Sequence, residues 1–351
     1  MKKLWIVGLL VAALTAVMVT PSEAWYSSRP RQLEVMSQNL YIGADLGRLL
    51  QGASPAELLA TVQQTNYPDR AVEIAQGIDD FNPDLIGLQE VTQITILDGQ
   101  LRPVAPPVDY LTILLDALAA EGEHYAVAAT VTNADATLPV GDGTYANVVD
   151  RDVILYRTST TRVSNPASGN YTTNFVATVF GTEIPFTRGW VAVDAHVAGR
   201  HIRFVNTHLE VEDAPCLVDG SLVECQDVQA TELVGIVGAE TDPVVLVGDF
   251  NAQPGETAYR TIDDAGFVDT WTIRYPLPRE AGYTCCQSET LDNVESQLDK
   301  RIDHIWLSDG DFGRFVAQTT VVGDWAERKT PGGLWYSDHG GPFARLHLFG
   351  D

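Results

Sequence analysis

Lysine is nearly absent from this 351-residue sequence, which contains Lys2, Lys3, Lys300 and Lys329 and no others. Lysine and arginine together number 22 against 47 aspartates and glutamates, so the formal net charge is −25 at pH 7. A surface this acidic repels polyanions, which disfavours a broad nucleic-acid-binding face. The charge contributes to solubility. It is still compatible with a site that binds a single phosphate group through a bound cation.

Loops that bind nucleotide phosphates are also absent, because the sequence has neither GxGxxG nor GxxxxGK[ST]. Its four cysteines lack the spacing of zinc ligands, and an even number is typical of disulfides in exported proteins. Cys216 and Cys225 are close enough in sequence to close a short polar loop. Cys285 and Cys286 are adjacent, and they either bridge each other or cross-pair with the first two.

Long apolar runs are missing except at the start of the chain, where residues 4–19 follow Lys2 and Lys3. Ser22-Glu23-Ala24 fits a small-x-small cleavage site. These features predict a signal peptide over residues 1–24, cleaved near Ala24, and a secreted protein, extracellular or periplasmic. An uncleaved anchor is the alternative. We expect residues 25–351 to form a single domain, because no linker or repeat divides them.

Short apolar runs alternate with amphipathic segments along the chain, which predicts an α/β fold with mixed sheets covered by helices. The stretch 190–208 alternates on both sides of Ala198-Gly199-Arg200, as an antiparallel hairpin does. The predicted helices span residues 68–81, 109–122, 226–239 and 256–265. The predicted strands span residues 33–38, 84–89, 124–131, 152–157, 190–197, 201–208, 243–248, 303–308 and 343–348.

Polar residues stand at the ends or starts of several predicted strands. Antiparallel neighbours bring the end of one strand beside the start of the next, so these residues can line one rim of the sheets. The carboxylates and amides among them suit Mg²⁺ or Mn²⁺, and the histidines suit acid–base chemistry near neutral pH. A divalent cation and an oriented histidine are the groups needed for water to attack phosphorus. The set is Asn39, Glu90, His208, Asp249, Asn251, Asp303, Asp338 and His339.

Six stretches resemble, in order, the motifs of the endonuclease/exonuclease/phosphatase superfamily. They are MSQNLYIG, LIGLQEV, FVNTHLE, LVGDFNA, KRIDHIWL and YSDHGGPFARLHL, and they extend over residues 36 to 348. This superfamily includes pancreatic-type DNases, abasic-site endonucleases, inositol-polyphosphate 5-phosphatases and bacterial neutral sphingomyelinases. The resemblance implies a four-layer α/β sandwich, in which two mixed β-sheets pack face to face with helices outside. It also implies that residues 25–351 are one catalytic domain.

The same resemblance implies a divalent cation, Mg²⁺ or Mn²⁺. Glu90 would be its principal ligand, with Asn39 beside it and Asp338 nearby. Asp249 would orient or deprotonate the attacking water, and Asn251 would help to hold the scissile phosphate.

The remaining implied roles concern the phosphate and the developing charge. His208 would contact the phosphate, and His339, paired with Asp303, would be the general base or would stabilise the transition state. The division of work between Asp249 and His339 stays open. Arg188 stands where relatives often carry a basic residue before a glycine, so it is a candidate to bind a substrate phosphate.

The expected substrate is a phospholipid or a small phosphoester. The stretch NTHLEVEDAPC is similar to the bacterial sphingomyelinase pattern, and sphingomyelinases carry exposed, membrane-touching aromatic residues before their Asp-His motif. Trp325, Trp335 and Tyr336 occupy that region here, which suggests transient contact with a membrane surface. Burial of these three side chains is the alternative. No stable protein partner is implied.

Two other functions remain. An extracellular nuclease that acts on DNA or RNA is compatible with export and with the shared site, although the acidic charge argues against it. A catalytically inactive binding protein on the same fold is the remote alternative, since every expected position carries the expected residue type.

Overall fold

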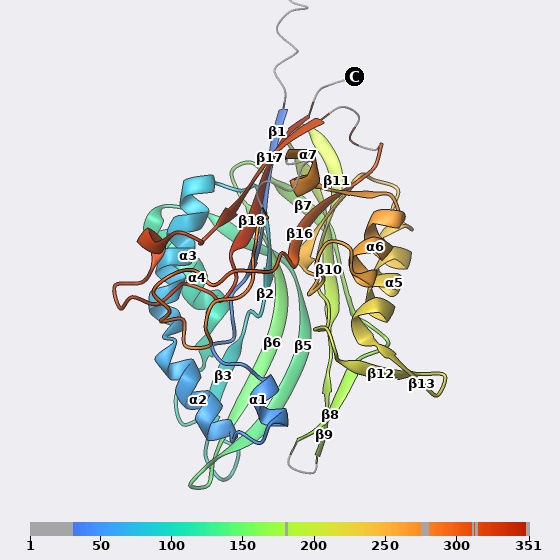
Figure 1. The fold of residues 1–351 in the computed structure, drawn as a ribbon. Helices are drawn as coiled ribbons and strands as arrows, with labels where there is room; N and C mark the ends of the chain where they lie inside the picture. Colours follow the sequence, from blue (N-terminus) through green and yellow to red (C-terminus); the bar gives the residue numbers. More distant parts are fainter. Residues whose placement is uncertain (1–30, 180–181, 275–280, 311, 313–314, 349–351) are drawn as a thin grey trace, which may run out of the picture.

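The computed structural model describes residues 31–348 except 180–181, 275–280, 311 and 313–314. Within these residues two mixed β-sheets pack face to face, with helices on the outer face of each (Figure 1). This arrangement confirms the predicted four-layer sandwich. The predicted signal peptide, residues 1–24, lies outside the described residues.

The first sheet has the strand order β17-β18-β1-β2-β6-β3-β4, and β5 pairs with β6. β1 and β2 are parallel, whereas β18 and β6 flank them in antiparallel orientation. The strands are β1 (Arg31–Asn39), β2 (Leu85–Gln89), β3 (Gln93–Leu97), β4 (Val108–Asp109), β5 (Tyr125–Gly141), β6 (Thr144–Arg157), β17 (Phe315–Val322) and β18 (Gly341–Leu348).

The second sheet has the order β15-β16-β14-β11-β10-β7, and two short hairpins, β8–β9 and β12–β13, lie apart from both sheets. The strands of the second sheet are β7 (Arg162–Asn170), β10 (Gly189–Val197), β11 (Arg200–His208), β14 (Val244–Asp249), β15 (Phe267–Asp269) and β16 (Asp303–Ser308). The hairpin strands are β8 (Phe175–Val179), β9 (Thr182–Phe186), β12 (Pro215–Val218) and β13 (Ser221–Glu224).

Helices cover the outer faces of the two sheets (Figure 1). α3 and α4 pack on the first sheet, and α5 and α6 pack on the second. No helix among the described residues is long and apolar enough to cross a bilayer. The helices are α1 (Gly47–Leu50), α2 (Pro55–Gln64), α3 (Tyr67–Phe81), α4 (Tyr110–Glu121), α5 (Cys225–Val237), α6 (Thr257–Asp264), α7 (Thr270–Arg274) and the 3₁₀ turn η2 (Ala326–Arg328).

The alternation of side chains along the strands divides the core into layers. On β1, Leu33 and Val35 belong to the cluster between the sheets, whereas Met36 packs toward α3 and α4. β2 divides in the same way, with Leu85 between the sheets and Ile86 under the helices. The period of two in the sequence therefore builds two apolar layers from one strand.

The predicted hairpin is confirmed. Val197 pairs with Arg200, and Ala198 and Gly199 form the two-residue turn with φ of 51° and 72°. Positive φ at both positions is the type I′ geometry, which matches the twist of the flanking strands. The other predicted strands and helices are also present, although β5 and β6 are much longer than the predicted spans 124–131 and 152–157.

The two sheets approach each other closely below the rim where β2 ends. A Cβ atom on Gly87 would lie 2.6 Å from Oδ1 of Asn206 and 2.6 Å from a methyl group of Val247. Nε2 of Gln89 donates across the interface to Oδ1 of Asn206 at 2.6 Å. Glycine at residue 87 therefore permits a buried hydrogen bond between the sheets.

Both pairs of cysteines form local disulfides. Cys216 of β12 is bonded to Cys225, the first residue of α5, and Cys285 is bonded to its neighbour Cys286. Of the two alternatives left open by the sequence, the structure therefore shows adjacent pairing.

Candidate functional site

The strand register of the second sheet brings three predicted site residues side by side. His208 at the end of β11 is the register partner of Asp249 at the end of β14, and Asp249 is the partner of Asp303 at the start of β16. All three side chains are buried, each at most 2% exposed. A strand end beside a strand start is the arrangement expected from the sequence.

Asn39 connects this row to the first sheet. Its Nδ2 donates to Oε1 of Glu90 at 3.1 Å and to Oδ2 of Asp249 at 3.1 Å. The backbone N–H of Tyr41 donates to Oδ1 of Asn39 at 2.9 Å, and that of Ile42 donates to Oε2 of Glu90 at 2.6 Å. The loop after β1 thus fixes the orientation of both side chains.

His339 reaches the same row from the loop before β18. Its Nδ1 lies 2.8 Å from Oδ2 of Asp303 and 3.8 Å from Oδ2 of Asp249. Burial alone lowers the pKa of His339, but Asp303, Asp338 and Asp249 outweigh it and raise that pKa well above its usual range. Burial and the nearby Asp303 also raise the pKa of Asp249 to about 7.

The two other predicted residues of these loops lie beside the same group. The backbone N–H of Asn251 donates to Oδ1 of Asp249 at 2.9 Å, and its Nδ2 donates to the carbonyl of Leu209 at 3.0 Å. Asp338 is partly exposed. Burial and the negative charge of Glu90 raise the pKa of Asp338 to about 7, against the opposing effect of His339.

Arg188 lies against His208. One guanidinium nitrogen is 3.2 Å from both ring nitrogens of His208, and the other donates to Oε1 of Glu210 at 3.1 Å. Burial, followed by the positive charges of Arg188 and His339, lowers the pKa of His208 well below its usual range. His208 is therefore a neutral ring at pH 7, and the Arg188 guanidinium supplies positive charge on its side of the site.

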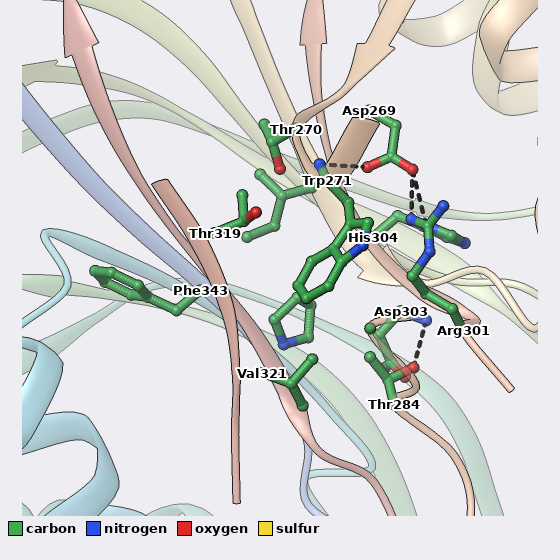
Figure 2. Close-up of a pocket in the computed structure, with 13 residues that line it drawn as sticks. Asp269, Thr270, Trp271, Thr284, Arg301, Asp303, His304, Thr319, Val321 and Phe343 are labelled. Atoms are coloured by element: carbon green, nitrogen blue, oxygen red, sulfur yellow. Dashed lines mark hydrogen bonds and ion pairs between the residues drawn. The ribbon is translucent and has the colours of Figure 1, made fainter. Parts of the chain in front are cut away.

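The polar residues behind Asp303 are shown in Figure 2. Oγ1 of Thr284 accepts hydrogen bonds from the backbone N–H groups of Ile302 and Asp303, each at 3.1 Å. Arg301 pairs with the buried carboxylate of Asp269 (Figure 2). The cavity among these residues has a volume of about 10 Å³, which is room for at most one water molecule, so it is not a substrate pocket.

Sequence reasoning missed a buried acidic pair on β6. Nδ2 of Asn133 donates to Asp152 at 2.8 Å and to Asp150 at 3.5 Å, and Oδ1 of Asp152 lies 4.0 Å from Nδ1 of His208. One carboxylate oxygen of each aspartate is buried without a hydrogen-bond partner. Burial and the charge of Glu90 raise the pKa of Asp150 to about 7. Two aspartates two residues apart before a strongly apolar strand segment are the signal that marks this pair.

Arg70 of α3 is a second residue that the sequence did not indicate. Its guanidinium is fully buried and donates to the carbonyl oxygens of Thr65, Leu40, Tyr41 and Tyr336 at 2.7–3.0 Å. It therefore joins the loop after Asn39 to the segment before Asp338 and His339.

The side chains at this rim fit a divalent cation. Glu90, Asn39 and Asp338 offer the hard oxygen donors that Mg²⁺ and Mn²⁺ prefer. The negative charge of Glu90 raises the pKa of Asp338, and a cation between the two carboxylates would relieve this repulsion. One oxygen of Asp303 is buried without a partner, and Asp249, Asp303 and His339 place their ligand atoms within 4.8 Å of one another.

Comparison with protein-family models gives one match, described as the endonuclease/exonuclease/phosphatase family, over residues 62–339. The match spans most of the chain and includes the rim from Glu90 to His339. This chain is a member of the endonuclease/exonuclease/phosphatase family. Its membership makes it a metal-dependent hydrolase of phosphoester bonds. Among curated proteins, no sequence matches it.

Solved structures of this family share the fold. The mannosyl-6-phosphatase of Bacteroides thetaiotaomicron is 18% identical, with 90% of this chain and 99% of that chain covered and a TM-score of 0.51. An endonuclease/exonuclease/phosphatase family protein of the same organism is 18% identical, with 90% and 98% covered and a TM-score of 0.53. D. rerio TDP2 with a single-strand DNA product is 16% identical, with 90% and 98% covered and a TM-score of 0.51.

The narrower likeness to bacterial sphingomyelinases stays a prediction, and of the two readings of its three aromatic residues, exposure or burial, the structure shows burial for two. Trp335 and Tyr336 are 1% and 2% exposed, whereas Trp325 is 39% exposed. Nε1 of Trp335 donates to the carbonyl of Asn293, and the Tyr336 hydroxyl donates to the carbonyl of Val322. Because their polar atoms are satisfied inside the fold, these two aromatic residues form no membrane-facing surface.

Proposed function

We propose that this family member is an exported, Mg²⁺-dependent hydrolase that cleaves a small soluble phosphoester by direct attack of water. The observation that supports this proposal most strongly is the convergence of His339, Asp303 and Asp249 beside Asn39 and Glu90. An oriented histidine and a buried carboxylate then stand next to an oxygen-rich cation site.

The position of each side chain in this cluster indicates its role in cation binding or in the attack of water. Glu90, Asn39 and Asp338 would hold the divalent cation, which when bound neutralises charge on the phosphate oxygens. Asp249 lies between His208 and His339, at 3.6 Å and 3.8 Å, where it is placed to orient the attacking water.

The remaining groups act on the phosphate. His339, held by Asp303, carries positive charge toward the oxygens on which negative charge develops. His208 and the amide of Asn251 hold the phosphate from the other side. Arg188 adds a fixed positive charge behind His208.

A small substrate with one phosphate group is favoured because the arginines at this rim are already partnered. Arg188 donates to Glu210, Arg301 to Asp269, and Arg70 to four backbone carbonyls. A strand of nucleic acid needs a run of available cations along its backbone. The burial of two of the three predicted membrane-facing aromatics also removes the main argument for a lipid surface.

Export is proposed from the apolar run with its cleavage site over residues 1–24. The two local disulfides agree with an oxidising compartment. N-terminal sequencing of protein recovered from culture medium or periplasm tests the cleavage near Ala24, and an intact N-terminus would contradict it.

A substrate panel with matched metal conditions tests the activity. Purified protein is assayed with Mg²⁺, Mn²⁺ or EDTA on sugar phosphates, bis-p-nitrophenyl phosphate, sphingomyelin vesicles and plasmid DNA. We expect turnover of the small phosphoesters that EDTA abolishes. Nicking of DNA at higher catalytic efficiency than any small ester would establish the nuclease alternative. Preferred cleavage of sphingomyelin vesicles would establish the phospholipid alternative, and no metal-dependent turnover would contradict the proposal.

A further inference from the structure

The disulfide Cys285–Cys286 lies directly against the predicted catalytic histidine. One ligand atom from each of Cys285, Cys286 and His339 lies within 4.8 Å of the others. Cys285 is 2% exposed, whereas Cys286 is exposed to solvent. A reductant can therefore approach the disulfide from the side of Cys286, whereas Cys285 is buried.

Backbone hydrogen bonds hold this pair between the two segments that carry the catalytic residues. Cys285 forms β-bridges with both Lys300 and His339. The N–H of Gln287 donates to the carbonyl of Asp338 at 2.9 Å, and the N–H of Lys300 donates to the carbonyl of Cys285 at 2.9 Å. The sulfur atoms are thus kept near the His339 ring by the fold around them.

We propose that Cys285 and Cys286, once reduced, form with His339 a site for a thiophilic divalent cation such as Zn²⁺, which withdraws His339 from hydrolysis. Two thiolates and an imidazole are the ligands that zinc prefers, and a fourth position stays open to water. Mg²⁺ prefers oxygen ligands, so the two cations select different parts of the rim.

An external thiol or a phosphine is the reductant, and a phosphine takes an oxygen atom from water, becomes the phosphine oxide and leaves the same two thiols on the protein. Two thiol molecules are oxidised to one disulfide, and their two electrons and two protons convert the Cys285–Cys286 bond into two thiols. When Zn²⁺ binds, the two thiols and the charged His339 ring each release one proton to solvent, so the cation is held by two thiolates and a neutral ring nitrogen. Exchange with an external disulfide, which takes up the two electrons and is reduced to two thiols, reforms the Cys285–Cys286 bond, removes both sulfur ligands and releases the cation.

The enzyme should therefore be unable to hydrolyse its substrate when Cys285 and Cys286 are reduced and zinc is present. Oxidation, which disulfide-forming compartments favour, frees His339. The predicted inhibition of hydrolysis rests on the proposed function. Cation binding by the reduced pair is independent of any substrate and is measured separately.

Cobalt spectroscopy of the full chain tests the binding site directly. Co²⁺ bound by thiolates absorbs in the near ultraviolet by sulfur-to-metal charge transfer, whereas Co²⁺ bound by oxygen ligands alone does not. We expect this band in protein reduced with a phosphine and its absence in the oxidised protein. Cys286→Ser should abolish it, and His339→Asn should weaken Co²⁺ binding by more than about 10-fold.

The second disulfide supplies the matched control. The double variant Cys216→Ser, Cys225→Ser lacks the other pair and should keep the full charge-transfer band after reduction. The proposal is overturned if reduced wild-type protein, with four free thiols by titration and an unchanged circular dichroism spectrum, shows no band. It is equally overturned if the band follows Cys216 and Cys225.

Hydrolysis provides the second readout. With saturating Mg²⁺, added Zn²⁺ should inhibit the reduced wild type and the Cys216/Cys225 double variant at least about 10-fold more strongly than the oxidised wild type. Equal inhibition of both redox states overturns the regulatory part. A charge-transfer band with no hydrolysis of any ester refutes the proposed function but leaves the cation site standing.

Discussion

Nδ1 of His339 lies 2.8 Å from Oδ2 of Asp303, and the two residues lie at the ends of strands that belong to opposite sheets of the sandwich. His339 comes just before β18 of the first sheet, and Asp303 begins β16 of the second. The hydrogen bond therefore joins the two halves of the fold at the point where the catalytic chemistry is proposed. It keeps His339 charged and directed toward Asp249.

Asp303→Asn tests this pairing. The amide cannot stabilise a charged imidazole as a carboxylate does, so we expect kcat to fall by about 10²- to 10⁴-fold with little change in KM. Steady-state kinetics on the best small phosphoester measures both constants. Asp299→Asn, the same change at an exposed residue nearby, is the control. Equal activity of the two variants would remove Asp303 from the mechanism.

Two glycine-to-alanine substitutions, one between the sheets and one in an open position, should change the free energy of unfolding in opposite directions. Gly87→Ala places a methyl group 2.6 Å from Asn206 and from Val247, and should lower the free energy of unfolding by about 1–3 kcal/mol. Gly235→Ala, in an open position of α5, should raise it by up to about 1 kcal/mol. Urea denaturation measures both changes. An unchanged free energy of unfolding in Gly87→Ala would show that the interface between the sheets can accommodate the methyl group.

Arg70 is expected to stabilise the loops of the site. Lysine cannot reproduce the planar set of donors that Arg70 directs to four carbonyls, so Arg70→Lys should cost about 1.5–3 kcal/mol of unfolding free energy. It should also weaken Mg²⁺ activation, since Leu40 and Tyr336 flank the cation ligands. Arg102→Lys, at a largely exposed ion pair, should change stability by less than about 0.5 kcal/mol. Similar losses in both variants would contradict the role of Arg70.

The buried carboxylate of Asp269 predicts a pH dependence of stability. Burial raises the pKa of Asp269, but His304 and Arg301 outweigh it and hold that pKa well below its usual range. A lowered pKa in the folded state stabilises the protein above the unfolded pKa of about 3.9, and this contribution is lost as pH falls below that value. Asp269→Asn should therefore be much less stable than wild type at pH 7, with a gap that narrows below about pH 4. Urea denaturation at several pH values measures the gap, with exposed Asp264→Asn as the control, and a constant gap would refute the prediction.

Much of the sandwich and of the rim follows from sequence periodicity. β14 ends at Asp249 and β16 begins at Asp303 because the apolar run stops at the first residue and starts after the second. Antiparallel pairing then places the two carboxylates together without further information. The same reasoning placed His208 and Glu90 at the ends of their strands.

Other features depend on contacts between distant segments, which periodicity does not contain. The partners of Arg70 are backbone carbonyls that come together only after the loop at Tyr41 and the segment at Tyr336 have folded. Asp152 faces Asn133 through the pairing of two long strands, β5 and β6, whose predicted spans were too short. Trp335 is buried among Tyr41, Ile42 and Leu291, which are distant from it in sequence.

Glu90 is proposed to bind the divalent cation used in phosphoester hydrolysis. The most direct test of this role is the Mg²⁺ dependence of hydrolysis after EDTA treatment, compared among wild type, Glu90→Gln and the exposed control Glu121→Gln. We predict no activity without metal, and recovery in wild type and Glu121→Gln at the same Mg²⁺ concentration. Glu90→Gln should need at least about 10-fold more Mg²⁺ for half-maximal activity. Full activity of the wild type in EDTA, or an unchanged Mg²⁺ midpoint in Glu90→Gln, would contradict this role of Glu90.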